Sequence, residues 1–133
     1  GWEAFSGCSG LTSVEIPASV RVISREAFSG CSGLTSIEIP ASVRVIGSEA
    51  FRDCSGLISV EIPPSVVEIG EYAFYRCSSM TSVEIPSSVI KIGNCAFENC
   101  HNLDIVIDNR EKNVRVGYDA FYGCKSVTWK KDM

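Results

Sequence analysis

The chain lacks several features that mark common functional classes. No apolar run approaches about 18 residues, the length that a membrane-spanning helix needs, so we expect no membrane insertion. The 12 basic and 16 acidic side chains are interspersed, and a net charge of −4 leaves no basic patch of the kind that binds nucleic acid. No secretory signal peptide opens the sequence, which says little because the chain begins inside a repeating unit.

Motifs that carry chemistry are also missing. The chain has a single histidine, His101, and shows no nucleophile–base pair, no metal-ligand cluster and no glycine-rich phosphate loop. We therefore expect no catalytic residue, no cofactor and no metal site, and we predict that the protein is not an enzyme.

What the chain does have is a unit of 23 residues that repeats with little drift. Ala-Phe pairs follow one another at steps of 23, 23, 23, 23 and 24 residues, and a cysteine comes three residues after each phenylalanine. A fixed period of this length predicts a solenoid, in which each coil packs only against its neighbours. The Ala-Phe pairs begin at Ala4, Ala27, Ala50, Ala73, Ala96 and Ala120.

Columns that stay apolar in every regular coil are expected to face the core, together with the Ala, Phe and Cys columns. These columns are Leu11/Leu34/Leu57/Met80, Val14/Ile37/Val60/Val83, Ile16/Ile39/Ile62/Ile85, Val20/Val43/Val66/Val89 and Ile23/Ile46/Ile69/Ile92.

Local patterns predict the path of each coil. Residues 35–39 alternate polar and apolar side chains and are rich in β-branched types, which predicts a strand that Pro40 ends. Residues 43–46 suit a short extended or 3₁₀ stretch. Glycines at the next position of three coils (Gly47, Gly70 and Gly93) suggest a turn with positive φ. Residues 48–54 suit one helical turn with Ser48 as its N-cap.

Six of the seven cysteines share one column of the repeat, at Cys8, Cys31, Cys54, Cys77, Cys100 and Cys124. Stacked coils place neighbours about 5 Å apart, which is within disulfide range. Identical side chains that point the same way rarely suit the disulfide dihedral, so we favour buried thiols that act as small hydrophobes. Cys95 lies outside this column, where other coils carry Glu or Tyr, and is expected to be an exposed, incidental thiol.

The unit at residues 34–57, Leu-Thr-Ser-Ile-Glu-Ile-Pro-Ala-Ser-Val-Arg-Val-Ile-Gly-Ser-Glu-Ala-Phe-Arg-Asp-Cys-Ser-Gly-Leu, resembles the BspA-like subclass of leucine-rich repeats. The resemblance covers residues 2 to about 103 well and the rest loosely. It implies a curved right-handed solenoid with a parallel sheet on its concave side and short extended, 3₁₀ or helical turns on its convex side. It also implies an extracellular or cell-surface protein of bacteria or some protists, and several members serve in adhesion.

Residues 1–133 are expected to form one solenoid, with four regular coils and partial or irregular coils at its ends. Because the start shows no polar cap, we expect a fragment or end module of a longer chain, or a processed precursor. The fifth coil loses Ile-Pro and gains a residue, which predicts a charged, bulged loop at residues 108–115, where the sheet ends or bends. Trp129 is expected to cover the last coil.

Glutamate recurs between the two inward residues of each predicted strand and should therefore point out of the sheet. Serine forms a second outward column beside it. We call these eight residues the glutamate strip: Glu15, Glu38, Glu61, Glu84, Ser13, Ser36, Ser59 and Ser82. One interpretation is an anionic, hydroxyl-lined surface that recruits basic partner segments or cations. The other is a copied, solvent-exposed glutamate that water and salt screen. A calcium site is less favoured, because a flat row of single carboxylates lacks a wrapping loop.

A second candidate surface is aromatic and is named here the tyrosine patch: Tyr72, Tyr75, Tyr118 and Tyr122. Tyrosine suits recognition because it is large, rigid and amphipathic. The alternative is a set of scattered surface tyrosines that partly cover the core. Arg21 and Arg44 share a column and are expected only to offset nearby acids.

These patterns favour a protein-binding module of a cell-surface or secreted protein, which engages partners through its concave sheet. The expected partners are host matrix or cell-surface proteins with basic segments, and bare solenoid ends could also drive end-to-end self-association. The alternative is a structural spacer that holds another domain away from a cell surface.

Overall fold

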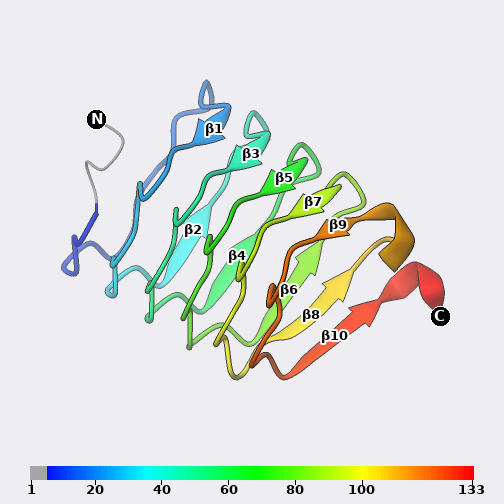
Figure 1. The fold of residues 1–133 in the computed structure, drawn as a ribbon. Helices are drawn as coiled ribbons and strands as arrows, with labels where there is room; N and C mark the ends of the chain where they lie inside the picture. Colours follow the sequence, from blue (N-terminus) through cyan, green and yellow to red (C-terminus); the bar gives the residue numbers. More distant parts are fainter. Residues whose placement is uncertain (1–5) are drawn as a thin grey trace.

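A computed structural model describes residues 6–133, so the first Ala-Phe pair, Ala4 and Phe5, lies outside the described residues. The chain winds as a parallel β-solenoid, with successive coils side by side from the N-terminal to the C-terminal end (Figure 1). The predicted fold class is thereby confirmed. The predicted strand recurs as β2 (Ser36–Glu38), β4 (Ser59–Glu61), β6 (Ser82–Ile85), β8 (Asp104–Ile107) and β10 (Ser126–Trp129).

The return path of each coil is extended, which was one of the two predicted alternatives, and it forms a second parallel sheet. Its strands pair in the order β1-β3-β5-β7-β9. Each strand is only two residues long, so the sequence shows no alternation over it, and the second sheet escaped prediction. The bounds are β1 (Val22–Ile23), β3 (Val45–Ile46), β5 (Glu68–Ile69), β7 (Lys91–Ile92) and β9 (Arg115–Val116).

The strand face that carries the glutamates is divided into two ladders. β2 pairs with β4, and β6 pairs with β8, which pairs in turn with β10. β4 and β6 lie side by side without forming a hydrogen-bonded ladder. The prediction that the sheet ends in the fifth coil is wrong, because β8 pairs in parallel with β6 on one side and with β10 on the other. The alternative, that the sheet bends there, stays a prediction.

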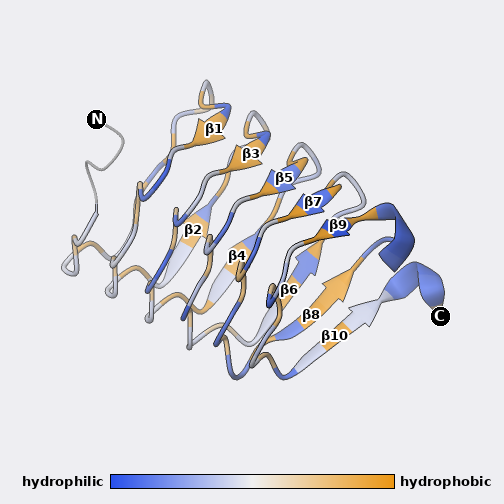
Figure 2. Cartoon of the chain, in the orientation of Figure 1, coloured by the Kyte–Doolittle hydropathy of each residue, from blue (hydrophilic) through white to orange (hydrophobic). Residues whose placement is uncertain are grey.

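The core lies between the two sheets and the turn side of the coils. The predicted apolar columns are buried in the central coils, and the first-coil members Leu11, Val14, Ile16 and Val20 are partly buried against them. Figure 2 shows hydrophobic residues at corresponding places in successive coils. Phenylalanine rings stack along the axis, with centroids 5.2 Å apart from Phe51 to Phe74 and again from Phe74 to Phe97.

The prediction of a helical turn at residues 48–54 is wrong. The segment forms consecutive turns closed by bonds such as Arg52 N–H to the Glu49 carbonyl, 3.2 Å, and each coil bonds to the next, as from Phe51 N–H to the Ala73 carbonyl, 2.8 Å. Ser48 is therefore no N-cap; its hydroxyl donates to the Glu71 carbonyl in the following coil at 3.3 Å.

The prediction of positive φ at Gly47, Gly70 and Gly93 is also wrong, since the positive-φ glycines among the described residues are Gly7, Gly30 and Gly123. The three glycines are needed for close approach instead. A Cβ on Gly70 would lie 2.7 Å from the Ser48 nitrogen, and one on Gly93 would lie 2.6 Å from the Glu71 nitrogen, both closer than real Cβ atoms come.

No disulfide joins the described cysteines, so the cysteine column is a set of core thiols, as favoured. The expectation that Cys95 is exposed is wrong, because only 3% of the residue is accessible. Its backbone has a φ of 58°. Burial is the main cause that raises the pKa of its thiol, and the Glu98 and Tyr72 side chains also interact with it.

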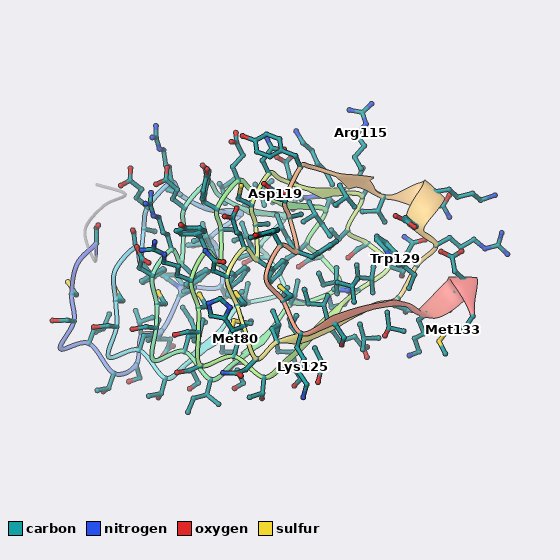
Figure 3. The ribbon with its side chains drawn as sticks, turned by 60° about the horizontal axis from the view of Figure 1, so that its bottom comes forward. Met80, Arg115, Asp119, Lys125, Trp129 and Met133 are labelled. Carbon is teal, nitrogen blue, oxygen red and sulfur yellow. The ribbon has the colours of Figure 1, made fainter. Side chains whose placement is uncertain are left out.

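The predicted loop at residues 108–115 contains a 3₁₀ turn, η1 (Glu111–Asn113), and the chain end, η2 (Lys130–Asp132), folds back onto it. Lys131 pairs with Asp108 at 3.2 Å, and Asp132 accepts a hydrogen bond from the backbone of η1 at 2.9 Å. Trp129 lies on the last strand (Figure 3), edge-on to Phe121 with ring centroids 6.4 Å apart, in the capping position predicted for it.

Candidate binding surfaces

The glutamate strip forms as predicted over the first three coils. Glu38 and Glu61 are register partners in the β2–β4 ladder, and Glu15 forms an isolated parallel bridge with Glu38. Ser36 and Ser59 are register partners beside them. All eight strip residues are exposed, because the strand pleat turns them outward while the intervening residues point into the core.

Beyond the third coil the strip changes. Glu84 has no carboxylate as its register partner in β8; it faces Val106. Ser82 faces Asp104, and Asp104 in turn faces Ser126, whose hydroxyl donates to the Asp104 Oδ1 at 2.6 Å. The fifth coil therefore keeps one carboxylate on this face but moves it from the glutamate column into the serine column.

A shallow hollow of about 510 Å³ lies in the middle of the strip. It is lined by Ser36, Ile37, Glu38, Ser59, Val60 and Glu61. Within residues 6–133, no ion pair involves any of the four strip glutamates. Like charges opposed on neighbouring strands destabilise a sheet by about 0.2–1 kcal/mol each. The strip therefore presents carboxylates that no basic group of the described chain neutralises.

The tyrosine patch is only partly assembled. Tyr72 and Tyr75 pack edge-on with ring centroids 5.2 Å apart, and both are half-buried. Tyr118 and Tyr122 remain 65% and 64% exposed, and the described part of the chain contains no ring contact between them and the first pair. The structure thus brings together two of the four predicted residues.

Two arginines complete the tyrosine pair and were missed by the sequence analysis. The Arg52 guanidinium lies 5.3 Å from the Tyr75 ring centre and 5.8 Å from that of Tyr72, while Arg76 lies 5.1 Å from Tyr75. Hydrogen bonding with the Cys95 thiol raises the pKa of Tyr72 to about 12. Arg52 shares its repeat column with Tyr75, and that shared column was the available signal. Because Tyr72 and Tyr75 already contact each other and these arginines, less of their ring surface is left for a partner.

The expectation that Arg21 and Arg44 offset nearby acids is wrong. Neither guanidinium has a carboxylate within 4.0 Å among residues 6–133. Both side chains are exposed, and the Arg44 backbone N–H donates to the Arg21 carbonyl at 2.7 Å, which fixes the two residues one above the other.

A second hollow, of about 640 Å³, was also missed. It lies where the irregular loop of the fifth coil meets the second sheet, and it is lined by Val67, Glu68, Ile90, Lys91, Lys112, Asn113, Val114 and Arg115. Ile90 is 60% exposed there, and Arg115 points away from the solenoid (Figure 3). In the sequence one column changes from a charged residue, Arg44, to the apolar residues Val67 and Ile90, but that change alone does not indicate a concave surface.

Residues 6–133 contain no group of three or more His, Cys, Asp or Glu side chains placed to hold a metal ion. The same residues include no helix long and apolar enough to span a membrane.

A family model described as a BspA type leucine rich repeat region matches residues 1–128 in six copies. No curated protein matches the chain. Among solved structures, a leucine rich repeat protein of T. pallidum is 32% identical, with a TM-score of 0.78 over 87% of this chain and 57% of that one.

Two further solved structures are similar. A leucine-rich repeat protein from Bacteroides ovatus is 33% identical, with a TM-score of 0.80 over 96% of this chain and 33% of that one. A leucine rich cell surface protein from Faecalibacterium prausnitzii is 27% identical, with a TM-score of 0.76 over 90% of this chain and 32% of that one. The chain spans between about a third and 57% of the length of these three proteins.

Proposed function

Because this chain belongs to the BspA-type leucine-rich repeat family, we propose that it is a non-catalytic protein-binding module of a cell-surface or secreted protein. The proposed partner is a protein with a basic segment, such as a host matrix or cell-surface protein. It is engaged on the strand face, which the family resemblance identifies as the concave one. The module then acts in adhesion, and the partner is held by the glutamate strip.

The observation that carries this proposal is the register of the strip. Glu15, Glu38 and Glu61 occupy successive positions on paired backbones, about 4.8 Å apart, with no basic residue of the described chain against them. Aligned like charges lower the stability of the sheet, and a binding role would offset that cost. A basic segment laid across the strip would remove the repulsion between the carboxylates and fill the hollow between Glu38 and Glu61.

The hydroxyls of the strip suit the same kind of partner. Ser36 and Ser59 flank the hollow and provide donors and acceptors beside the carboxylates. Lysine and arginine side chains can therefore pair with glutamate while the peptide that carries them bonds to serine. Because exposed ion pairs contribute little singly, we expect affinity to arise from several pairs formed together and to fall with salt.

A structural spacer is the second candidate function. The stacked phenylalanines and the backbone bonds between coils favour it, because they hold the coils together as one continuous solenoid without the help of a ligand. In this account the glutamates serve only to keep the surface soluble.

Cell-surface or extracellular location is part of the proposal and is supported by the similarity to the leucine rich cell surface protein of Faecalibacterium prausnitzii. End-to-end association of solenoid ends remains a further expectation.

The experiment that tests the function is binding of the chain to a panel of matrix and cell-surface proteins, in parallel with a variant in which Glu15, Glu38, Glu61 and Glu84 are replaced by Gln. A binding module loses saturable binding in the variant. A spacer binds nothing in either form and only gains stability on removal of the like charges.

A further inference from the structure

Arg21 and Arg44 form a second like-charged pair, away from the glutamate strip. They lie on neighbouring coils one strand spacing apart, about 4.8 Å, because the Arg44 N–H donates directly to the Arg21 carbonyl. Between them lies a hollow of about 410 Å³ whose other lining residues are small, among them Ala18, Ala41 and Ser42. The Ser42 hydroxyl donates to the Val20 carbonyl of the preceding coil at 2.7 Å, which ties the two coils together at this corner.

Four other cations of the described chain are paired within it: Arg25, Arg52, Lys91 and Lys131. Arg52 pairs with Glu49 at 2.8 Å, and Lys131 pairs with Asp108 at 3.2 Å. Arg25 also approaches Glu49, at 3.6 Å. Arg21 and Arg44 have no such partner among residues 6–133, although both are exposed and long enough to reach one if it were near.

The arginine pair and the central glutamates of the glutamate strip have the same spacing and opposite charge. Glu38 and Glu61 flank one hollow, and Arg21 and Arg44 flank the other, each pair separated by one strand spacing of a parallel ladder. We propose that the arginine pair of one copy of this chain docks on the glutamate strip of a second copy, with Arg21 and Arg44 facing two successive glutamates. This inference rests on the proposed function, because it names a second copy as one protein that the strip receives.

The arrangement has a consequence for assembly. The arginine pair and the glutamate strip occupy different surfaces of one chain, so a contact between them is heterologous. Each bound copy still offers either a free arginine pair or a free glutamate strip to a further copy. Such contacts do not close unless a rotation brings the ends together, and the product is an open row of solenoids. Each contact is weak because its ion pairs are exposed, so the row forms at high protein concentration and low salt.

The test is sedimentation of the purified chain over a range of concentrations at low and high salt. The wild type is expected to associate at low salt and to be monomeric at high salt. The double variants Arg21→Glu/Arg44→Glu and Glu38→Arg/Glu61→Arg are each expected to associate at least tenfold more weakly. An equimolar mixture of the two is expected to regain association, because each then presents what the other lacks.

A control variant, Lys125→Glu/Lys130→Glu, changes the net charge as much as the arginine variant does but leaves the arginine pair and the glutamate strip unchanged. It is expected to associate like the wild type. The proposal is overturned if the wild type stays monomeric at low salt, if the control loses association equally, or if the mixture stays monomeric. Circular dichroism checks folding, and Arg21→Gln/Arg44→Gln replaces any charge-reversed variant that does not fold.

The arginine variant also separates this proposal from the function on which it rests. It keeps all four strip glutamates, so it should bind a basic matrix protein as the wild type does. Loss of self-association with retained matrix binding supports both proposals. A monomeric wild type that binds the matrix panel overturns self-association and leaves the binding function standing.

Discussion

The thiol of Cys54 donates a hydrogen bond to the carbonyl oxygen of Phe28 in the preceding coil, with 3.1 Å between sulfur and oxygen. The relationship recurs from Cys77 to Phe51 and from Cys100 to Phe74. The cysteine column therefore does more than fill space, because each thiol joins its own coil to the one before. Burial raises the pKa of Cys54 to about 12, which keeps the proton that this bond needs.

Replacing Cys54 by alanine should lower the free energy of unfolding by about 1–2 kcal/mol, because the substitution removes buried atoms and one hydrogen bond. Cys8→Ala, at a half-exposed position of the same column, should cost less than about 0.5 kcal/mol. Urea unfolding of both variants under reducing conditions measures the difference. Equal losses would contradict a special role for the buried thiols.

Alkylation should distinguish the cysteines in the native state. Thiolate is the reactive form, and both Cys54 and Cys95 are buried and have raised pKa values, so both should react slowly with iodoacetamide. Half-exposed Cys8 should react faster. Peptide mapping by mass spectrometry gives each rate, with denatured protein as the fully reactive control. Rapid native labelling of Cys95 would show that its thiol is accessible in the folded protein.

Stability should fall at alkaline pH. Burial raises the pKa of Cys54 and Cys100 to about 12, whereas an unfolded cysteine has a pKa of about 8.5. Above the lower value the unfolded chain releases protons that the folded chain retains, so the stabilisation present below about pH 8.5 is lost as pH rises toward about 12. Urea titrations between about pH 7.5 and 9.5 measure the slope. The slope should shrink in a Cys54→Ala/Cys100→Ala variant, and an unchanged slope would exclude these two thiols as its source.

Gly70 should not tolerate a side chain. An added Cβ would lie 2.7 Å from the Ser48 nitrogen, and backbone cannot yield cheaply, so Gly70→Ala should lower the free energy of unfolding by about 2 kcal/mol or more. Gly10→Ala is the matched control, since nothing lies within 4 Å of its added Cβ, and it should be neutral or slightly stabilising. Thermal melts compare the two. A neutral Gly70→Ala would mean that the coils are not packed so closely.

Much of the fold could be predicted because a solenoid repeats the same strand, turns and core positions in every coil. The strand, the apolar columns and the cysteine column all follow from aligning the chain with itself, and Glu38 could be placed outward from strand alternation alone. The burial of Cys95 could not be predicted, because it depends on a backbone φ of 58° that the type of side chain does not indicate. The equivalent position holds Glu26, Glu49 and Tyr72, also with positive φ.

A second left-handed position had a readable signal that the sequence analysis did not use. The residue before each cysteine of the column has positive φ, and Gly30, Asp53 and Asn99 there are types that favour this conformation. The candidate sites were predictable only in part. A column of glutamates is visible in the sequence, but the hollow between Glu38 and Glu61 emerges only when coils are placed side by side. The same holds for the lack of any carboxylate within 4.0 Å of Arg21 among residues 6–133.

The measurement that tests the binding account most directly is the dissociation constant for a basic matrix protein found by the panel, taken at low and at physiological salt for three proteins. These are the wild type, the Gln variant at Glu15, Glu38, Glu61 and Glu84, and a control that neutralises four acids away from the strip: Glu71, Glu98, Glu111 and Asp119. The account predicts tight, salt-sensitive binding by the wild type and the control, and at least tenfold weaker, salt-insensitive binding by the Gln variant. Equal binding by all three would contradict a role for the strip.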